Sequence, residues 1–191
     1  MRKAKEKLII VSAPSGAGKS TIVKHLLNTF PDFAFSVSAT SRPIRKGEVD
    51  GREYFFMTSD EFREKIEAGE LLEWQEVYPG SFYGTLKSEV DRMLLNRKVP
   101  VFDVDVVGGL NIKKMYGEKA LALFVQPPTL EELEKRLRNR GTDSEDSLKK
   151  RIAKASWELE FAPEFDAIII NDDLENAFAE AEKTVTEFLK D

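Results

Sequence analysis

The fold is decided by one stretch near the start of the chain, Lys7-Leu8-Ile9-Ile10-Val11-Ser12-Ala13-Pro14-Ser15-Gly16-Ala17-Gly18-Lys19-Ser20-Thr21. Residues 8–11 are all apolar, and the short run predicts a fully buried strand over residues 7–12. A glycine-rich turn follows, and from Lys19 a helical pattern runs to about Asn28, where Phe30-Pro31 ends it. A strand, a glycine-rich turn and a helix in this order are the context in which a phosphate-binding loop occurs.

The loop has the chemistry that ATP requires. Its glycines let backbone N–H groups converge on phosphate oxygens, and the start of the helix adds the positive end of a dipole. Lys19 can reach the β- and γ-phosphates, and the Ser20 hydroxyl can ligate Mg²⁺. The usual pattern G-x-x-x-x-G-K-[ST] begins with glycine, whereas here that position is Ala13. The residues predicted to bind ATP are Ala13, Pro14, Ser15, Gly16, Ala17, Gly18, Lys19, Ser20 and Thr21.

Later apolar runs predict three more buried strands, at residues 99–104, 120–125 and 167–170. Helical patterns separate or follow them, at residues 89–96, 130–138 and 174–189. Because these runs lack polar alternation and helices lie between them, we predict an α/β fold with a parallel sheet that helices flank on both faces. With the loop, this is a P-loop NTPase-type architecture.

Two stretches interrupt this pattern. From residue 35 to about 83, short alternating pieces with turn signals predict a small mixed β insertion with one helix at about 59–67. From residue 139 to about 161 the chain is strongly polar and predicts a helical lid. We therefore expect a single domain over residues 1–191, divided into a core (1–34, 86–140 and 162–191), a nucleotide-binding insertion (35–85) and a lid (141–161).

Bulk composition narrows the function classes. Hydrophobic residues make up 41% and charged residues 33%, an ordinary globular balance. The net charge of −5 disfavours a nucleic-acid binder, which needs a basic face. The chain has no cysteine, which excludes disulfides and cysteine-based zinc sites. No apolar run could cross a bilayer and no signal-peptide pattern is visible, so we expect a cytoplasmic protein with no membrane, nucleic-acid or obligate protein partner.

A second candidate site begins at Arg42 and Arg45, which stand three residues apart beside several hydroxyl residues. Arginine binds phosphate in a bidentate way, and hydroxyls add further contacts. Glu73 follows, and a carboxylate near hydroxyls suits guanine because it accepts from the ring N–H and the exocyclic amine. Adenine has an acceptor where guanine has that ring N–H, so the same carboxylate repels adenine.

Taken together, these motifs resemble those of the guanylate kinase family, in the same order and over nearly the whole chain from Leu8 onward. The motifs are residues 13–21 after the first strand (Ala-Pro-Ser-Gly-Ala-Gly-Lys-Ser-Thr), 36–48 (Ser-Val-Ser-Ala-Thr-Ser-Arg-Pro-Ile-Arg-Lys-Gly-Glu), 51–56 (Gly-Arg-Glu-Tyr-Phe-Phe), 72–74 (Leu-Glu-Trp), 83–85 (Tyr-Gly-Thr) and 140–142 (Arg-Gly-Thr). The resemblance implies transfer of phosphate from ATP to GMP, with Mg²⁺ as cofactor. It departs at Val107, where that family commonly has glutamine.

The resemblance also implies roles for particular residues. Ser38, Glu73 and Thr85 would hold the guanine, with Asp103 and Asp105 lining the same pocket. The phosphate of GMP would be held by Arg42, Arg45, Tyr54 and Tyr83. Asn171 matches a position near the nucleoside of ATP. The groups expected to neutralise the transferred phosphoryl are Lys19, Arg42, Arg140 and Arg151.

Three alternatives remain. The chain could be a kinase of another nucleoside monophosphate, against which Glu73, Ser38 and Thr85 argue. It could be a peptide-binding module of guanylate-kinase-like fold that has lost catalysis, but Lys19 and Ser20 are intact. A regulatory GTPase is disfavoured because nothing resembles the Asn-Lys-x-Asp motif that reads guanine in those proteins.

Overall fold

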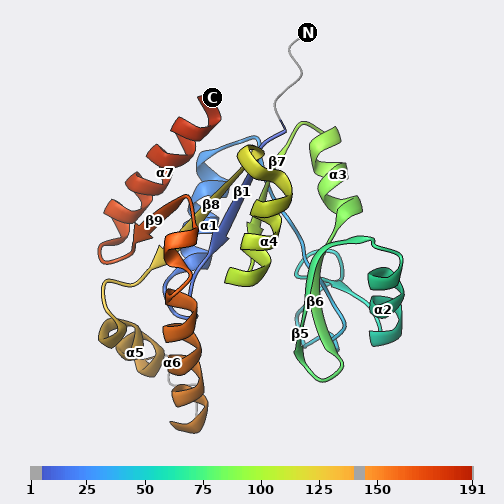
Figure 1. Ribbon diagram of the computed structural model, residues 1–191, viewed down its shortest axis with the longest axis horizontal. Helices are drawn as coiled ribbons and strands as arrows, with labels where there is room; N and C mark the ends of the chain where they lie inside the picture. The colour runs from blue at the N-terminus through green and yellow to red at the C-terminus, as the bar shows by residue number, and fades with distance from the viewer. Residues whose placement is uncertain (1–5, 140–144, 191) are drawn as a thin grey trace.

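A five-stranded sheet forms the centre of the protein (Figure 1), whose computed structural model describes residues 6–139 and 145–190. The strands run in the order β2-β7-β1-β8-β9, and every neighbouring pair is parallel. Their bounds are β1 (Leu8–Ser12), β2 (Phe33–Phe35), β7 (Val99–Asp103), β8 (Ala120–Gln126) and β9 (Ala167–Ile170).

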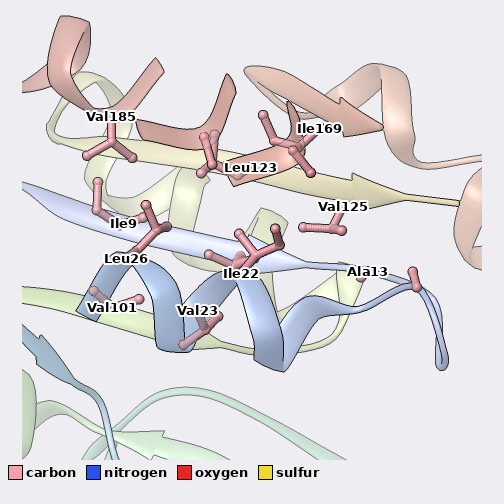
Figure 2. Close-up of a cluster of buried hydrophobic side chains, with 14 of the residues drawn as sticks. Ile9, Ala13, Ile22, Val23, Leu26, Val101, Leu123, Val125, Ile169 and Val185 are labelled. Carbon is pink, nitrogen blue, oxygen red and sulfur yellow. The ribbon is translucent and has the colours of Figure 1, made fainter. Parts of the chain in front are cut away.

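The side chains of β1 explain why helices cover both faces of this sheet. Successive side chains of a strand point to opposite faces. Ile9 and Val11 lie in a buried cluster with α1 (Lys19–Thr29) and α7 (Leu174–Lys190), which Figure 2 shows. Leu8 and Ile10 lie in a second cluster, with α3 (Lys87–Leu95) and α4 (Val106–Tyr116). Full burial of each such side chain contributes about 1.5–3 kcal/mol to the stability of the fold. A sheet covered by helices on one face only would lose this contribution at every second position of β1. The predicted fold class is confirmed.

A second, four-stranded sheet lies beside the core in the order β4-β3-β6-β5. Its β3 and β4 are parallel, and its other pairs are antiparallel. Helix α2 (Ser59–Glu67) packs on it through Phe62, which is fully buried against Phe82. A capping box between Thr58 and Glu61 starts this helix. The strand bounds are β3 (Ala39–Thr40), β4 (Phe55–Phe56), β5 (Leu71–Tyr78) and β6 (Ser81–Leu86).

Two helices lie on the other side of the core in Figure 1, α5 (Leu130–Asn139) and α6 (Glu145–Leu159). They pack together through buried apolar residues that include Leu133 and Leu148. The short turns η1 (Gly117–Lys119) and η2 (Ala162–Glu164) lead into β8 and β9. Within the described ranges, no helix combines the length and the apolar character needed to span a bilayer.

The structure contains two core elements that the sequence patterns did not predict. β2 has only three residues, too few for an apolar run, and it extends the central sheet to Phe35, the residue at which the insertion was expected to start. α4 begins with Val106-Val107-Gly108-Gly109, and both valine and glycine are poor helix formers. Tertiary packing of Ile112 and its neighbours therefore decides this helix.

Candidate active site

The turn after β1 has the geometry of a phosphate-binding loop. Gly16 and Gly18 adopt positive φ values of 94° and 98°, and Gly18 caps the N-terminus of α1. A Cβ atom on Gly18 would lie 2.2 Å from the Asn171 side-chain nitrogen. Both the positive φ and this close approach therefore require glycine at position 18. Ala13 is buried and has no such backbone need, since Arg97 is the sole non-glycine residue of ranges 6–139 and 145–190 with positive φ. Alanine therefore replaces the first glycine without strain.

The polar side chains of the loop meet the end of the neighbouring strand β7. The Lys19 ammonium lies 2.7 Å from Asp103 Oδ1 and donates to the Val104 carbonyl at 3.1 Å. The Ser20 hydroxyl lies 3.5 Å from Asp103 Oδ2. The contact follows from the sheet, because β1 and β7 are parallel neighbours with Val11 opposite Asp103, so that both carboxyl ends reach the same edge.

A cleft of about 330 Å³ opens over this loop. Besides loop residues, its lining includes Asp105 and two residues of α6, Lys154 and Glu158. Neither α6 residue was predicted. Their sequence signal is the spacing from Arg151, at i+3 and i+7, which puts all three on one helix face. The Arg151 guanidinium donates to the Ser15 hydroxyl at 2.6 Å, so that this face of α6 touches the loop.

A second cleft of about 220 Å³ lies between the core and the small sheet. Glu73 lines this cleft, and its cross-strand neighbour Thr85, which is buried behind it, donates its hydroxyl to Glu73 Oε1 at 2.7 Å. Burial raises the pKa of Glu73 to about 7, the hydrogen bond from Thr85 opposes this, and the charge of Asp105 adds to it. The residues that line the cleft are Ser38, Tyr54, Glu73, Gln75, Val77, Tyr83, Gly84, Asp103, Val104 and Asp105.

The two clefts meet at the end of β7. Asp105 lines both of them, and Asp103 lines the second while it pairs with Lys19 of the first. Asp105 also caps α4, since its Oδ1 accepts from the Gly108 N–H at 2.8 Å. A Cβ atom on Gly108 would lie 2.9 Å from Glu73 Oε2, so glycine lets α4 approach that carboxylate. The cleft over the phosphate-binding loop thus shares a wall residue, Asp105, with a cleft that holds a buried carboxylate.

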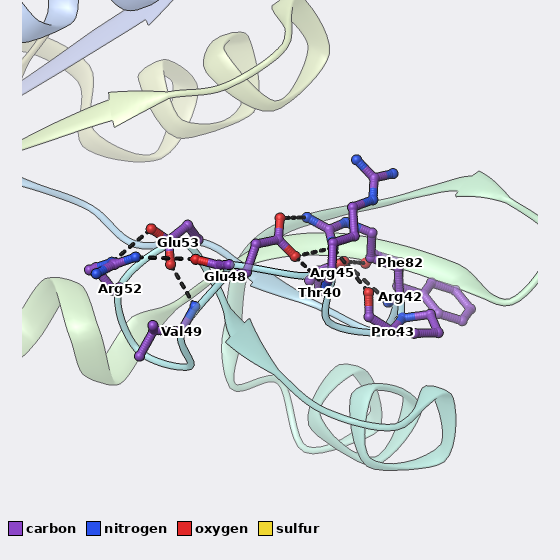
Figure 3. A network of polar contacts seen from close by, with 10 residues as sticks. Thr40, Arg42, Pro43, Arg45, Glu48, Val49, Arg52, Glu53 and Phe82 are labelled. Carbon is purple, nitrogen blue, oxygen red and sulfur yellow. Dashed lines mark hydrogen bonds and ion pairs between the residues drawn. The ribbon is translucent and has the colours of Figure 1, made fainter.

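A pair of charges fixes Arg42 beside the second cleft (Figure 3). Its guanidinium donates to both carboxylate oxygens of Glu48, at 2.7 and 2.6 Å, and lies 5.0 Å from the Tyr54 ring centre. The hydrogen bonds from Arg42 lower the pKa of Glu48 to about 2, and the same pair raises the pKa of Arg42. The Arg45 backbone N–H donates to Glu48 at 2.8 Å. Glu48, which was not predicted, therefore orients the Arg42 guanidinium and holds the backbone at Arg45.

The sequence model of the family described as guanylate kinase matches residues 5–188 of this chain. The chain belongs to the guanylate kinase family. It is 58% identical over 183 residues to a guanylate kinase of Bacteroides fragilis, covering 96% of this chain and 90% of that protein. It is 50% identical to one of Porphyromonas gingivalis, covering 96% and 98%. A crystal structure of guanylate kinase from Anaplasma phagocytophilum superposes with a TM-score of 0.73 at 26% identity, covering 96% and 86%.

Guanylate kinase membership makes the chain a kinase, a nucleotide-binding transferase of purine nucleotide metabolism. The linings of the two clefts include many of the predicted site residues, but not Ala17, Arg42, Arg45, Thr85, Arg151 or Asn171. Asn171 is buried behind the loop, and its side-chain amide donates to the Ala17 carbonyl at 2.7 Å. The backbone carbonyl of Asn171 accepts from the Arg136 guanidinium. Val107 is more than a third exposed at the start of α4. Arg140 lies outside the described residues.

Proposed function

We propose that the protein transfers the γ-phosphoryl group of ATP to GMP and yields ADP and GDP. The observation that carries the proposal is the meeting of the two clefts at Asp103 and Asp105, with Lys19 on one side and the Glu73–Thr85 pair on the other. A donor phosphate over the loop and an acceptor in the second cleft can then approach each other directly. Such proximity is the main demand of phosphoryl transfer.

Guanine would be read by Glu73, whose ionised carboxylate accepts from the ring N–H and the exocyclic amine. Thr85 already donates to one carboxylate oxygen, which keeps the group oriented. Ser38 lines the same cleft and can supply a further contact to the base. Adenine lacks the ring N–H, and the carboxylate would face its lone pair instead. A buried polar site rejects a ligand that leaves its groups unpaired, which supports GMP over AMP.

The acceptor phosphate would be bound by Arg42, Arg45, Tyr54 and Tyr83. Tyr54 and Tyr83 both line the second cleft, and Arg42 stacks near the Tyr54 ring. The bidentate pair with Glu48 leaves further N–H donors of the Arg42 guanidinium for phosphate. The acceptor oxygen of GMP is already anionic, so the reaction requires no general base. Positioning and charge neutralisation suffice.

On the donor side, Lys19 and Arg151 would neutralise the transferred group, and we propose Arg140 as a third cation. Mg²⁺ fits the hard oxygen donors present, because the Ser20 hydroxyl and Asp103 Oδ2 lie 3.5 Å apart beside Lys19. Ser20 and Asp103 would hold the ion. When bound, it would supply further positive charge to the phosphates of ATP. Asn171 would act on ATP through the loop that it supports.

We further propose that residues 35–85 and 141–161 close over the nucleotides and leave the core unchanged. Closure would exclude water, which otherwise competes with GMP for the phosphoryl group. It would also bring Arg42 and Arg151, which stand on different segments, toward the same phosphates. The division of the chain into core, insertion and lid is part of this proposal.

A coupled assay of ADP formation tests the proposed function. Purified protein is incubated with ATP, Mg²⁺ and, in turn, GMP, AMP, CMP and UMP. We expect turnover with GMP to exceed turnover with every other acceptor by about tenfold or more. A preference for a pyrimidine or adenine nucleotide would reassign the acceptor cleft. Absence of turnover with all four, in a folded protein that binds none of them, would favour an interaction module.

A further inference from the structure

One face of α6 presents a charged pair to the phosphate loop. Lys154 and Glu158 both line the cleft over the loop, one helical turn apart. Arg151, on the same face, donates to the Ser15 hydroxyl at 2.6 Å. The face is therefore fixed against the loop at one end, and Lys154 follows within the same cleft. Its position differs from that of Lys149, which lies about opposite on the helix and is exposed.

Glu158 makes this arrangement unusual for a phosphate site. Its side chain is buried, and burial raises the pKa of the carboxyl, with the charges of Lys154 and Lys19 opposing the shift. A buried carboxylate beside a polyphosphate would repel it unless a cation stands between them. Lys154 Nζ lies 3.7 Å from Glu158 Oε1, longer than a hydrogen bond. The Lys154 side chain is 54% exposed and lines the cleft together with Glu158.

We propose that Lys154 is a further catalytic residue, which binds the phosphates of ATP over the loop and is held in the cleft by Glu158. The proposal rests on the proposed function, because it takes ATP as the ligand of that cleft. Lys19 lies 2.7 Å from Asp103, whose carboxylate partly cancels the positive charge of Lys19. The ammonium of Lys154 would supply additional positive charge to the phosphates. Because Lys154 lies on α6, its contact with phosphate would make the position of that helix depend on whether ATP is bound.

The test compares Lys154→Met, which keeps the length and removes the charge, with Lys154→Arg and the control Lys149→Met. We expect Lys154→Met to lower kcat about tenfold or more and to raise KM for ATP, with KM for GMP within about twofold of the parent. Lys154→Arg should recover most of the rate, and Lys149→Met should behave as the parent. Equal rates for parent and Lys154→Met would overturn the proposal.

A double variant separates contact with phosphate from mere neutralisation of Glu158. If Lys154 only cancels the Glu158 charge, then Lys154→Met combined with Glu158→Gln would regain the parent rate, and the proposal is wrong. We expect the double variant to stay at the low rate of Lys154→Met. Calorimetric titration with a non-hydrolysable ATP analogue, without GMP, gives a reading that does not depend on the acceptor. Affinity should fall about fivefold or more in Lys154→Met, even if the parent were to use another acceptor.

Discussion

The Lys19 ammonium lies 2.7 Å from Asp103 Oδ1, a contact between the start of α1 and the end of β7. Both side chains are about one-fifth exposed, so the pair is partly shielded from water, and the Val104 carbonyl holds the same ammonium at 3.1 Å. The contact holds the Lys19 ammonium beside the end of β7, in the lining of the first cleft. A cation that is already oriented loses less side-chain freedom when phosphate arrives, which favours binding.

Lys19→Ala is expected to keep the fold and to lose most of the activity. The side chain would neutralise phosphate charge in the transition state, and loss of such a contact lowers the rate by roughly 100-fold or more. Steady-state rates with ATP and GMP check this, with circular dichroism to confirm folding. Lys24→Ala is the matched control, since Lys24 lies exposed on the same helix. Turnover of the folded Lys19 variant near the parent rate would contradict the role of the loop.

Glu73→Gln is expected to weaken discrimination between GMP and AMP. The substitution keeps the shape but replaces one acceptor oxygen with a donor, which leaves polar groups unpaired against guanine. We expect the ratio of kcat/KM for GMP over AMP to fall by about tenfold or more, chiefly through weaker GMP binding. Glu76→Gln, on the same strand but outside the cleft lining, serves as the control. Unchanged discrimination would transfer the base-reading role, with Asp103 the next candidate.

Glu73 should also make stability depend on pH. Its pKa rises from 4.5 to about 7 in the folded chain, so folding favours the neutral carboxyl. The unfolded chain releases this proton first, and the free energy of unfolding therefore falls as the pH rises from about 4.5 to about 7, then levels off. The glutamine of Glu73→Gln cannot ionise, so the free energy of unfolding of this variant should exceed that of the parent by about 1–3 kcal/mol at pH 8.

Urea denaturation without nucleotide, repeated between pH 4.5 and 8, measures this difference. The stability gap between variant and parent should shrink as the pH falls toward 4.5. The same gap at both ends of the range would show that the carboxyl of the folded chain ionises normally.

Nucleotides should slow hydrogen exchange in two segments, residues 35–85 and residues 145–161. Without ligand, Arg42 is paired with Glu48 and Arg151 with Ser15, on opposite sides of the core. GMP and ATP bring negative charge between them, which gives the closed arrangement contacts that the open one lacks. We therefore expect slower exchange when GMP and a non-hydrolysable ATP analogue are added together. β1 should be protected throughout, because its residues are fully buried.

The exchange experiment has an internal reference in β1. Each nucleotide added alone should protect mainly the segment that it contacts. Equal exchange with and without both nucleotides, or protection of both segments equal to that of β1 from the start, would refute closure.

Local spacing in the sequence determined the glycine-rich loop after β1 and the buried strands of the core. An apolar run as short as residues 8–11, followed directly by a glycine-rich turn, favours a strand buried on both faces, and such a turn before Lys19-Ser20 is typical of a phosphate-binding loop. The role of Glu73 in reading guanine stays a prediction, which rests on the resemblance to the family and on the donors and acceptors of the base. These features depend on residues close together in the chain or on the ligand's own pattern of donors and acceptors.

Tertiary structure alone decided which distant residues share the site. The register of β1 against β7 brings Asp103 to Lys19, and the packing of α6 brings Lys154 and Glu158 over the loop. Asn171, 154 residues beyond Ala17 in the chain, supports the loop from behind because β9 ends beside it. No local pattern encodes such contacts, since they follow from how the strands are ordered in the sheet and how the helices pack on it. The same packing, rather than intrinsic propensity, made a helix of Val106–Tyr116.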